Sequence, residues 1–499
     1  MPAISGNGAV SEAKVARTGT EMDDTALTTT TPIPAPAGSR TAVSLVSDNL
    51  VAFALRAAGA RAAIRTLDLQ YYIWNEDVTG RLLAWEVLQA ADRGVRVRLL
   101  LDDLYVRRTE RALAALAQHP RIEVRLYNPF QLRSWGALGN AVEFLFAGYR
   151  LNHRMHNKTW IVDRQLAIGG GRNVGDEYFD AASQFNFRDL DLAVTGRSAH
   201  QTGALFDLYW NSFRVRPIGE IAAVRRSEGE LDELRHRLDS AATSAPCAAY
   251  RERLNVSPEL SALLEDGCVT LPADSVRVVA DPPEKGRARR GSAPDVLDAV
   301  RNTVDAARRE VLLISPYFVP GRRALRSFTT LTRRGIRVAV LTNSLAATDV
   351  LAVHGGYARH RRRLLRAGIE LHELKRGGQE GQSLFGSSGG ASLHTKAFVV
   401  DGELIFVGSF NLDPRSAYLN TEMGTFARHP VLGDMLRQEY ARLADPARSW
   451  TVRLERGRLT WSDRVEGGQG GVLHGEPDTT LTRRVLARVL GWLPIEPQL

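Results

Sequence analysis

Two copies of one short pattern contain the residue types in this chain that are best suited to catalysis. Each copy has a histidine, a lysine two positions later and an aspartate five positions after the lysine. The six residues are His156, Lys158, Asp163, His394, Lys396 and Asp401. Lysine is rare here, with five lysines among 65 basic residues, so its presence in both copies indicates a need for a compact ammonium group. One copy alone would usually be an ordinary surface strand, but two copies predict a catalytic pair.

A glycine-rich tail follows each copy and ends in an asparagine ten residues after the aspartate. Asn173 ends the first tail and Asn411 ends the second. We expect each tail to end a strand, where glycines let backbone N–H groups approach a phosphate. Asn173, Asn411 and Ser409 are the candidate substrate-binding residues. The first tail has Gly171 where the second has Ser409, so we expect the half-sites to differ by one hydroxyl group.

Two imidazoles in one site favour phosphodiester exchange. One histidine can attack phosphorus and form a phosphohistidine, while the other protonates the leaving alkoxide and later deprotonates the incoming hydroxyl. The two lysines would stabilise charge on the phosphoryl oxygens. We predict His156 as the nucleophile and His394 as the general acid and base, and the sequence also allows the reverse. No cluster with metal-ligand spacing accompanies the motifs, so we expect no metal and no other cofactor.

The motif aspartates should lie away from the histidines. Residues seven positions apart on a strand point to opposite faces, so structural roles are the more natural expectation for Asp163 and Asp401. Acidic residues elsewhere in the chain would then orient the imidazoles. Asp189 and Glu422 are the candidates, because they follow the asparagine of their tail by sixteen and eleven residues in strand-like stretches.

The chain also repeats on a larger scale. Apolar runs at 67–74 and 310–317 each precede a helical stretch and a second apolar run, at 93–103 and 334–344. The second runs match at an offset of 241 residues, and the histidine motifs match at 238. Alternating strands and helices predict an α/β fold in each half, with helices on both faces of a mixed or largely parallel sheet.

Composition and the repeat together suggest domain boundaries. We predict a disordered lead-in at 1–45, a first domain at 46–220, a linker or insertion at 221–290, a second domain at 291–447 and a tail at 448–499. The lead-in is rich in Thr, Pro and Ala, which is typical of a segment without a packed core. The Gly/Ser-rich stretch 377–390 should be a mobile loop before the second motif.

Two charged segments have more than one interpretation. Apolar residues recur at helical spacing within 481–493, and the arginines lie largely off that face, which predicts an amphipathic helix. Such a helix fits a membrane interface, and it equally fits a helix packed on the body of the protein. The run 359–363 is rich in arginine and is usually a solvated helix face, with a phosphate-facing role as the alternative.

Several segments besides the motifs resemble the phospholipase D superfamily, including 68–74, 343–350, 408–416 and 420–424. The resemblance covers 46–447 and continues into the tail. Within the superfamily, the chain more specifically resembles bacterial cardiolipin synthases of the class that lacks transmembrane helices. It implies two tandem phospholipase D-like α/β/α sandwich domains related by pseudo-twofold symmetry, with the two motifs as half-sites.

The resemblance also implies a reaction. It suggests a phosphatidyl transferase with phosphatidylglycerol as acceptor and phosphatidylethanolamine as a candidate second donor. A phospholipid hydrolase and a nuclease or other phosphodiesterase of the superfamily are the alternatives. An apolar pocket would help to keep water from the intermediate. The aromatic residues expected to line it are Tyr71, Tyr72, Trp74, Tyr317 and Phe318.

Net charge of +9 and a pI near 9.7 favour an anionic partner, here a membrane surface. We expect no nucleic acid, because no basic groove interleaved with aromatic residues is evident. No stretch reaches the roughly 18 apolar residues that span a bilayer, and no secretory signal is visible. We therefore expect a cytoplasmic protein that is peripheral to the cell membrane, and the oligomeric state stays open.

Overall fold

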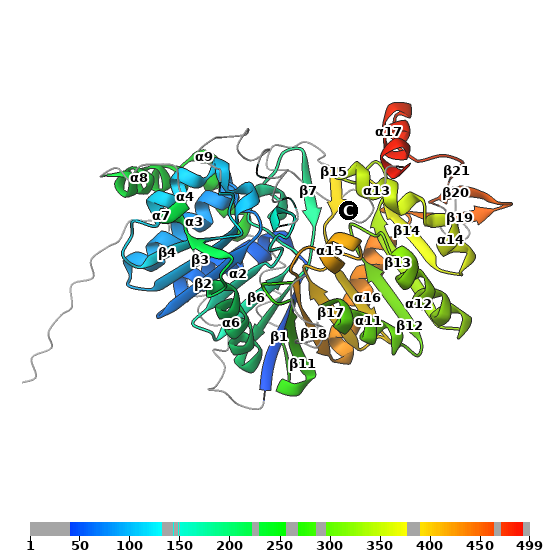
Figure 1. The fold of residues 1–499 in the computed structure, drawn as a ribbon, viewed down its shortest axis with the longest axis horizontal. Coiled ribbons are helices and arrows are strands. Elements are labelled where there is room, and N and C mark those ends of the chain that lie inside the picture. Colours follow the sequence, from blue (N-terminus) through cyan, green and yellow to red (C-terminus); the bar gives the residue numbers. More distant parts are fainter. Residues whose placement is uncertain are drawn as a thin grey trace, which may run out of the picture.

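Two large mixed sheets, one in each half of the chain, lie side by side in the computed structural model (Figure 1). The structure describes residues 40–131, 143, 148, 150–221, 229–255, 268–285, 296–376, 390–463 and 471–492. A small parallel sheet of β7 (Phe185–Arg188) and β15 (Gly390–Leu393) joins the halves.

The two large sheets have equivalent topology. The first contains, in spatial order, β10 (Val269–Pro272), β1 (Arg40–Val46), β8 (Asp191–Thr195), β6 (Leu166–Gly170), β5 (Thr159–Val162), β2 (Thr66–Tyr71), β3 (Arg96–Asp102), β4 (Ile122–Tyr127) and β9 (Val215–Pro217). The second contains β11 (Val276–Ala280), β18 (Met423–Arg428), β17 (Leu404–Gly408), β16 (Ala397–Val400), β12 (Glu310–Ile314), β13 (Arg337–Asn343), β14 (Glu370–Leu374), β19 (Ser449–Glu455), β20 (Arg458–Ser462) and β21 (Val472–Leu473).

In spatial order, the seven strands β1, β8, β6, β5, β2, β3 and β4 of the first sheet correspond one by one to β11, β18, β17, β16, β12, β13 and β14 of the second. In each set the last three strands are parallel and the others are antiparallel. The predicted α/β duplication is therefore confirmed.

Helices form three layers around these sheets. They are α2 (Asn49–Ala62), α3 (Val78–Asp92), α4 (Glu110–Leu116), α6 (Gly196–Trp210), α7 (Ile218–Ile221), α8 (Glu230–Ala242), α9 (Ala245–Asn255), α11 (Val296–Asp305), α12 (Gly321–Arg333), α13 (Leu351–Ala358), α14 (Arg361–Arg366), α15 (Pro414–Tyr418), α16 (Pro430–Ala444) and α17 (Leu481–Trp492). One apolar core lies between the first sheet and α2, α3, α8 and α9, and another between the second sheet and α11 to α14. A central core includes α6 and α16 and unites the two sheets.

Local sequence explains these elements. Asp48 and Asp77 cap α2 and α3, because their carboxylates accept hydrogen bonds from the N–H groups of Val51 (2.8 Å) and Gly80 (2.9 Å). Strands β3 and β13 are buried at every residue after the first, as expected where both faces of a parallel region are covered.

Three predicted boundaries need correction. Strand β1 begins at Arg40, inside the lead-in predicted for 1–45, because it pairs with β8 and β10. The predicted linker 221–290 contains α8 and α9, which pack on the first half, and the edge strands β10 and β11. The predicted tail contains β19, β20 and β21, which extend the second sheet. Strands β1 and β11 belong to the seven corresponding strands, although their sequences do not reveal the repeat, whereas β10, β19, β20 and β21 are added by hydrogen bonding at the edges of the shared unit.

Some predictions fall on residues outside the described part of the chain. These are the disorder of 1–39, most of the 377–390 loop and the end of the tail beyond residue 492. Within the described ranges, no helix combines the length and the apolar character needed to cross a bilayer.

Candidate active site

The histidine and lysine of each motif lie where the halves meet, directly before β5 and β16. The backbone N–H of His156 donates to the carbonyl of Thr421 (2.9 Å), and that of His394 donates to the carbonyl of Arg188 (2.8 Å). Each histidine is thus bonded to a residue of the other half. This exchange brings both motifs into one site, as the duplicated sequence predicts.

Each imidazole contacts a carboxylate from the opposite half. Nδ1 of His156 lies 2.9 Å from Oε2 of Glu422, and Nδ1 of His394 lies 2.6 Å from Oδ2 of Asp189. The structure therefore brings both predicted orienting residues to the histidines. A proton on Nδ1 that is donated to the carboxylate leaves the lone pair on Nε2, which is the tautomer required of a nucleophile or a base.

Burial lowers the pKa of both imidazoles. The pKa of His156 falls to about 4, mainly because burial disfavours the charged form, and Glu422 partly counteracts this. The pKa of His394 lies well below its usual range because of burial and the positive charges of Lys396 and Lys158. His156 also contributes to the pKa of His394, so the two rings share one electrostatic environment. Both rings are neutral at pH 7.

An ammonium group lies beside each imidazole. Nζ of Lys158 donates to the carbonyl of His156 (2.6 Å), and Lys396 donates to the carbonyl of His394. Nζ of Lys396 is also 2.9 Å from Nδ1 of His394, but the proton on that nitrogen is donated to Asp189, so the lysine bonds to the carbonyl. Burial lowers the pKa of both lysines, to about 8 for Lys396. A bound phosphate diester would favour their charged forms.

Glu422 is held by hydroxyl groups of its own half. Ser409 donates to Oε2 at 2.5 Å, and Ser416 donates to Oε1 at 2.8 Å. Burial raises the pKa of Glu422, but His156, Lys158 and Ser409 together outweigh burial and lower it below its usual value. The sequence suggested Ser409 as a substrate-binding residue. Its hydroxyl is instead engaged by the carboxylate, so we infer that it supports Glu422.

The absence of a hydroxyl at Gly171 has a steric cause. A Cβ atom at this position would lie 2.1 Å from Oδ1 of Asp189 and 2.6 Å from its Cγ and Oδ2. Asp189 therefore occupies the space that any larger residue would need. Burial raises the pKa of Asp189, and Lys396 and Arg172 only partly offset this effect. The two half-sites thus differ in how strongly their carboxylates are stabilised.

The two predicted asparagines have different surroundings. Oδ1 of Asn173 accepts from the N–H of Ile73 (3.2 Å), and its Nδ2 donates to the hydroxyl of Tyr178 (2.9 Å). Oδ1 of Asn411 is buried and has no hydrogen-bond partner among the described residues. An amide oxygen can only accept, so Oδ1 of Asn411 could receive a hydrogen bond from a hydroxyl group but not from phosphate oxygens, whereas Asn173 positions Tyr178.

Asp163 and Asp401 lie at the other end of their strands from the histidines. Both have positive φ angles, 49° and 55°, in the turns that follow β5 and β16. The carboxylate of Asp163 accepts three backbone N–H groups from residues 64–66, and that of Asp401 accepts three from residues 308–310. Although they complete the catalytic motif, these residues join neighbouring segments and have no contact with the imidazoles.

Aromatic rings surround the histidines, but not all those expected from the sequence. The ring of Tyr72 is centred 5.0 Å from that of His156, and the rings of Tyr178 and Phe187 are 5.3 and 4.9 Å from that of His394. Only Tyr72 belongs to the predicted pocket lining, since Tyr178 and Phe187 come from other segments.

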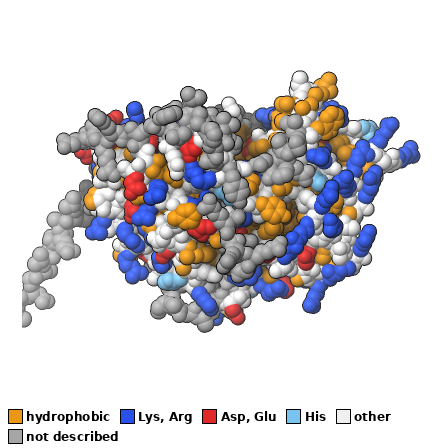
Figure 2. Space-filling model, in the orientation of Figure 1, with side chains coloured by type: hydrophobic (Ala, Val, Ile, Leu, Met, Phe, Trp, Pro, Cys, Tyr) orange, Lys and Arg blue, Asp and Glu red, His pale blue; other side chains and the backbone are white. Residues whose placement is uncertain are grey.

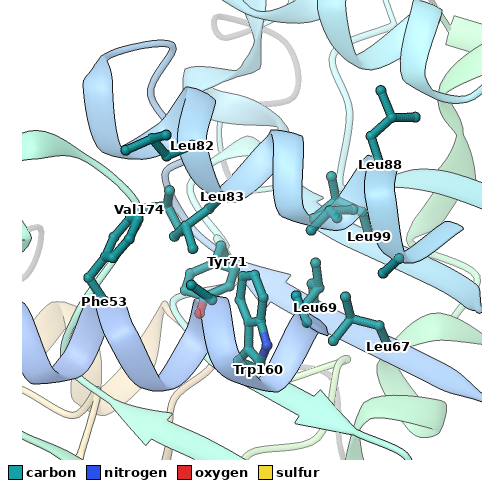
Figure 3. Packing of buried hydrophobic residues seen from close by; sticks show 14 of the residues in the cluster. Phe53, Leu67, Leu69, Tyr71, Leu82, Leu83, Leu88, Leu99, Trp160 and Val174 are labelled. Carbon is teal, nitrogen blue, oxygen red and sulfur yellow. The ribbon is translucent and has the colours of Figure 1, made fainter. Parts of the chain in front are cut away.

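The other four predicted lining residues have different positions. Tyr71 is completely buried in the apolar core of the first half (Figure 3). Phe318 is completely buried in the core of the second half, and Trp74 packs against the same core as Tyr71. The hydroxyl of Tyr317 donates to Asp349 at 2.7 Å. Tyr71 ends β2 with its side chain in the core, whereas Trp74, Tyr317 and Phe318 lie beyond the ends of β2 and β12, where strand alternation does not set the direction of a side chain.

One supporting group was missed by sequence analysis because it lies in the predicted linker. Nζ of Lys285 donates to Oδ2 of Asp281 (2.6 Å) and to the carbonyl of Ser416 (2.7 Å). The same carboxylate oxygen of Asp281 accepts from the backbone N–H of Glu422 at 2.9 Å. The buried pair of Lys285 and Asp281 therefore holds the backbone of Glu422 in place. The only sequence signal was that Lys285 is one of the few lysines.

Within the described residues, no group of three or more His, Cys, Asp or Glu side chains could hold a metal ion. Two neutral imidazoles and two lysines suit a single phosphoryl group.

Comparison with known proteins agrees with this geometry. The family model "Cardiolipin synthase, PLD-like domain" matches residues 59–201 and 300–444. The chain belongs to this family. It is 40% identical to cardiolipin synthase C of Escherichia coli K12 over 90% of this chain and 94% of that protein. It is also 32% identical to an uncharacterized protein of Helicobacter pylori J99, over 92% of this chain and 89% of the relative.

A solved structure shares the fold. Phosphatidylserine synthase of Haemophilus influenzae Rd KW20 superposes with a TM-score of 0.58 at 13% identity, covering 92% of this chain and 95% of that one. The predicted fold class and the predicted class of enzyme, a phosphatidyl transferase of the phospholipase D superfamily, are therefore confirmed.

Proposed function

We propose that this chain makes cardiolipin by transferring a phosphatidyl group to phosphatidylglycerol through a phosphohistidine on His156. The observation that carries the proposal is the exchange of carboxylates between the halves, which gives two imidazoles with Nε2 lone pairs in one site. Such a pair can divide displacement at phosphorus into two steps. The leaving oxygen needs a proton in the first step, and the attacking hydroxyl must lose one in the second.

In the first step, Nε2 of His156 attacks the phosphorus of the donor, and the bond from phosphorus to the head-group oxygen breaks. His394 gives its Nε2 proton to that oxygen. It acquires this proton when the diester binds, because the negative charge raises its pKa. In the second step, the neutral His394 takes the proton of the phosphatidylglycerol hydroxyl, whose oxygen attacks phosphorus as the P–N bond breaks.

Each carboxylate has a matching role. Glu422 carries the lowered pKa and remains charged, so it stabilises positive charge that develops on His156 as its ring attacks. Asp189 keeps Nδ1 of His394 protonated and directs Nε2 towards the exchanging proton. Tyr72, Tyr178 and Phe187 place apolar surface beside the rings, which favours a lipid hydroxyl over water.

The test supplies the purified chain with labelled phosphatidylglycerol in detergent micelles, with and without phosphatidylethanolamine. Labelled cardiolipin is the expected product, and an increase on adding phosphatidylethanolamine would identify it as the second donor. Formation of phosphatidic acid alone would show a hydrolase. Cleavage of single-stranded DNA without any lipid product would show a nuclease. A phosphohistidine trapped on position 394 would reverse the roles of the two histidines.

A further inference from the structure

The terminal helix α17 has an unusual arrangement of its two faces. The residues it buries are small, Ala487 and Gly491. Its large apolar side chains point outwards: Leu481 and Trp492 are 75% and 81% exposed, and three others are about half exposed, namely Val485, Leu486 and Val489. Hydrophobic side chains accordingly gather at the top of the molecule over α17 (Figure 2). A helix that served only to cover the body would bury this face instead.

Close backbone packing holds α17 in this orientation. A Cβ atom on Gly355 of α13 would lie 2.4 Å from the carbonyl oxygen of Ala487 and 2.9 Å from the N atom of Gly491. Arg359 also donates to the carbonyl of Gly491 at 2.8 Å. Because the two helices touch through their backbones, a rotation of α17 that buried its large side chains would collide with α13.

A buried ionic network anchors the segment before α17. Arg361 lies 2.8 Å from Glu373, and its guanidinium also pairs with Glu476. The same guanidinium is 2.9 Å from Nε2 of His354. The arginine-rich run 359–363 was expected to be a solvated or phosphate-facing helix surface. Its central arginine is instead completely buried and fixes the start of the terminal segment.

The helix also stands beside the catalytic site. Arg483 donates to the carbonyls of Leu345 (2.9 Å) and Thr348 (2.8 Å), which belong to the loop after β13. At the end of β13, Asn343 exchanges two hydrogen bonds of 2.9 Å with Leu393, the residue before His394. Asp349, in the same loop, contributes to the pKa of Lys396. One loop thus contacts α17 on one side and the second half-site on the other.

We propose that α17 is a membrane-contact helix whose exposed apolar face enters the interface of an anionic bilayer and presents the catalytic site to lipid. The helix carries three arginines and no acidic residue, so its charge matches anionic lipid. A tryptophan at its end suits the boundary between head groups and acyl chains. The inference deepens the proposed function and rests on it for the identity of the lipid substrates.

The test measures binding of the full chain to vesicles of phosphatidylglycerol and phosphatidylcholine by sedimentation. Replacing three outward residues together, Leu486→Ser, Val489→Ser and Trp492→Ser, should weaken binding by on the order of tenfold or more. Thermal unfolding and turnover on detergent-dispersed lipid should stay unchanged, because none of these side chains is buried. A matched control changes exposed apolar residues of the first half, Ile64→Ser, Leu208→Ser and Phe213→Ser, and should bind as the wild type does.

The outcomes separate this inference from the proposed function. Undiminished vesicle binding by the α17 variant would overturn membrane contact even if cardiolipin is formed. A wild-type dimer that the variant converts to a monomer, without a change in vesicle binding, would assign the face to a second copy of the chain and also overturn it. Weakened binding together with no lipid product in any form would leave membrane contact standing and refute the proposed reaction.

Discussion

Nδ1 of His156 lies 2.9 Å from Oε2 of Glu422, a residue 266 positions later in the chain. The reciprocal contact joins His394 to Asp189 at 2.6 Å across 205 positions. Each motif histidine is therefore paired with a carboxylate of the other half. We therefore expect catalysis to require both halves to be folded and joined, since each supplies the carboxylate that contacts the other's imidazole.

The first prediction concerns these carboxylates. Glu422→Gln and Asp189→Asn keep the size of the side chain but remove the charge that holds the Nδ1 proton, so each should lower kcat by about 10- to 100-fold. Initial rates of cardiolipin formation in micelles measure this. Glu403→Gln is the matched control, because Glu403 is half-exposed and pairs only with Arg428 among the described residues. Wild-type rates in both site variants would exclude the orienting role.

The second prediction concerns the asymmetry of the glycine-rich tails. Gly171→Ser places a Cβ atom against the carboxylate of Asp189, so we expect a loss of about 1–3 kcal/mol in the free energy of unfolding and a fall in kcat as His394 loses its partner. Gly169→Ala is the control, since its Cβ would meet neighbours no closer than 3.7 Å. Chemical denaturation compares the two variants, and equal stability would show that the tail can relax around a serine.

The third prediction is proton uptake on ligand binding. Both imidazoles are neutral at pH 7 because burial lowers their pKa, to about 4 for His156. A phosphodiester monoanion beside them raises these values, so binding of dimethyl phosphate should take up a proton. Calorimetry in buffers of different ionisation enthalpy counts the protons. His394→Gln should reduce the uptake if His394 is the acid, and binding without uptake in the wild type would contradict the proposed first step.

The fourth prediction concerns stability at acidic pH. His156 has a folded-state pKa of about 4 against an ordinary value of 6.5, so between these limits the unfolded chain binds more protons. The contribution of His156 to the free energy of unfolding is therefore fully present above pH 6.5. As the pH falls towards 4, about 3 kcal/mol of this free energy is lost. Burial raises the pKa of Asp413 and of Asp77 to about 7, which acts in the opposite direction. The difference between wild type and His156→Gln isolates the histidine, and parallel stability curves from pH 4 to 7 would refute this assignment.

The fifth prediction concerns the buried arginine of α14. Arg361→Met leaves the carboxylates of Glu373 and Glu476 without their main cation, and should cost about 3–5 kcal/mol in the free energy of unfolding. Arg362→Met, at an exposed neighbouring position, is the control and should change stability little. Denaturant titration measures both. A small effect at position 361 would mean that the buried acids are readily protonated or hydrated.

The sequence by itself determined the duplication, the α/β class and the paired histidine motifs. These follow from local pattern, since apolar runs, helical stretches and the spacing of His, Lys and Asn repeat along the chain. It also indicated that the motif aspartates would lie away from the imidazoles, because strand alternation fixes the direction of a side chain from its position.

Only the tertiary structure decided which groups meet. The carboxylate of Glu422 reaches His156 because two sheets pack through one central core, and no local pattern encodes that distance. The same holds for Lys285, whose place in an apparent linker hid its bond to Asp281, and for Arg361, whose charged neighbours suggested solvent. Burial of a charged residue depends on partners that are remote in sequence, so composition predicts exposure where packing and ion pairing produce the opposite.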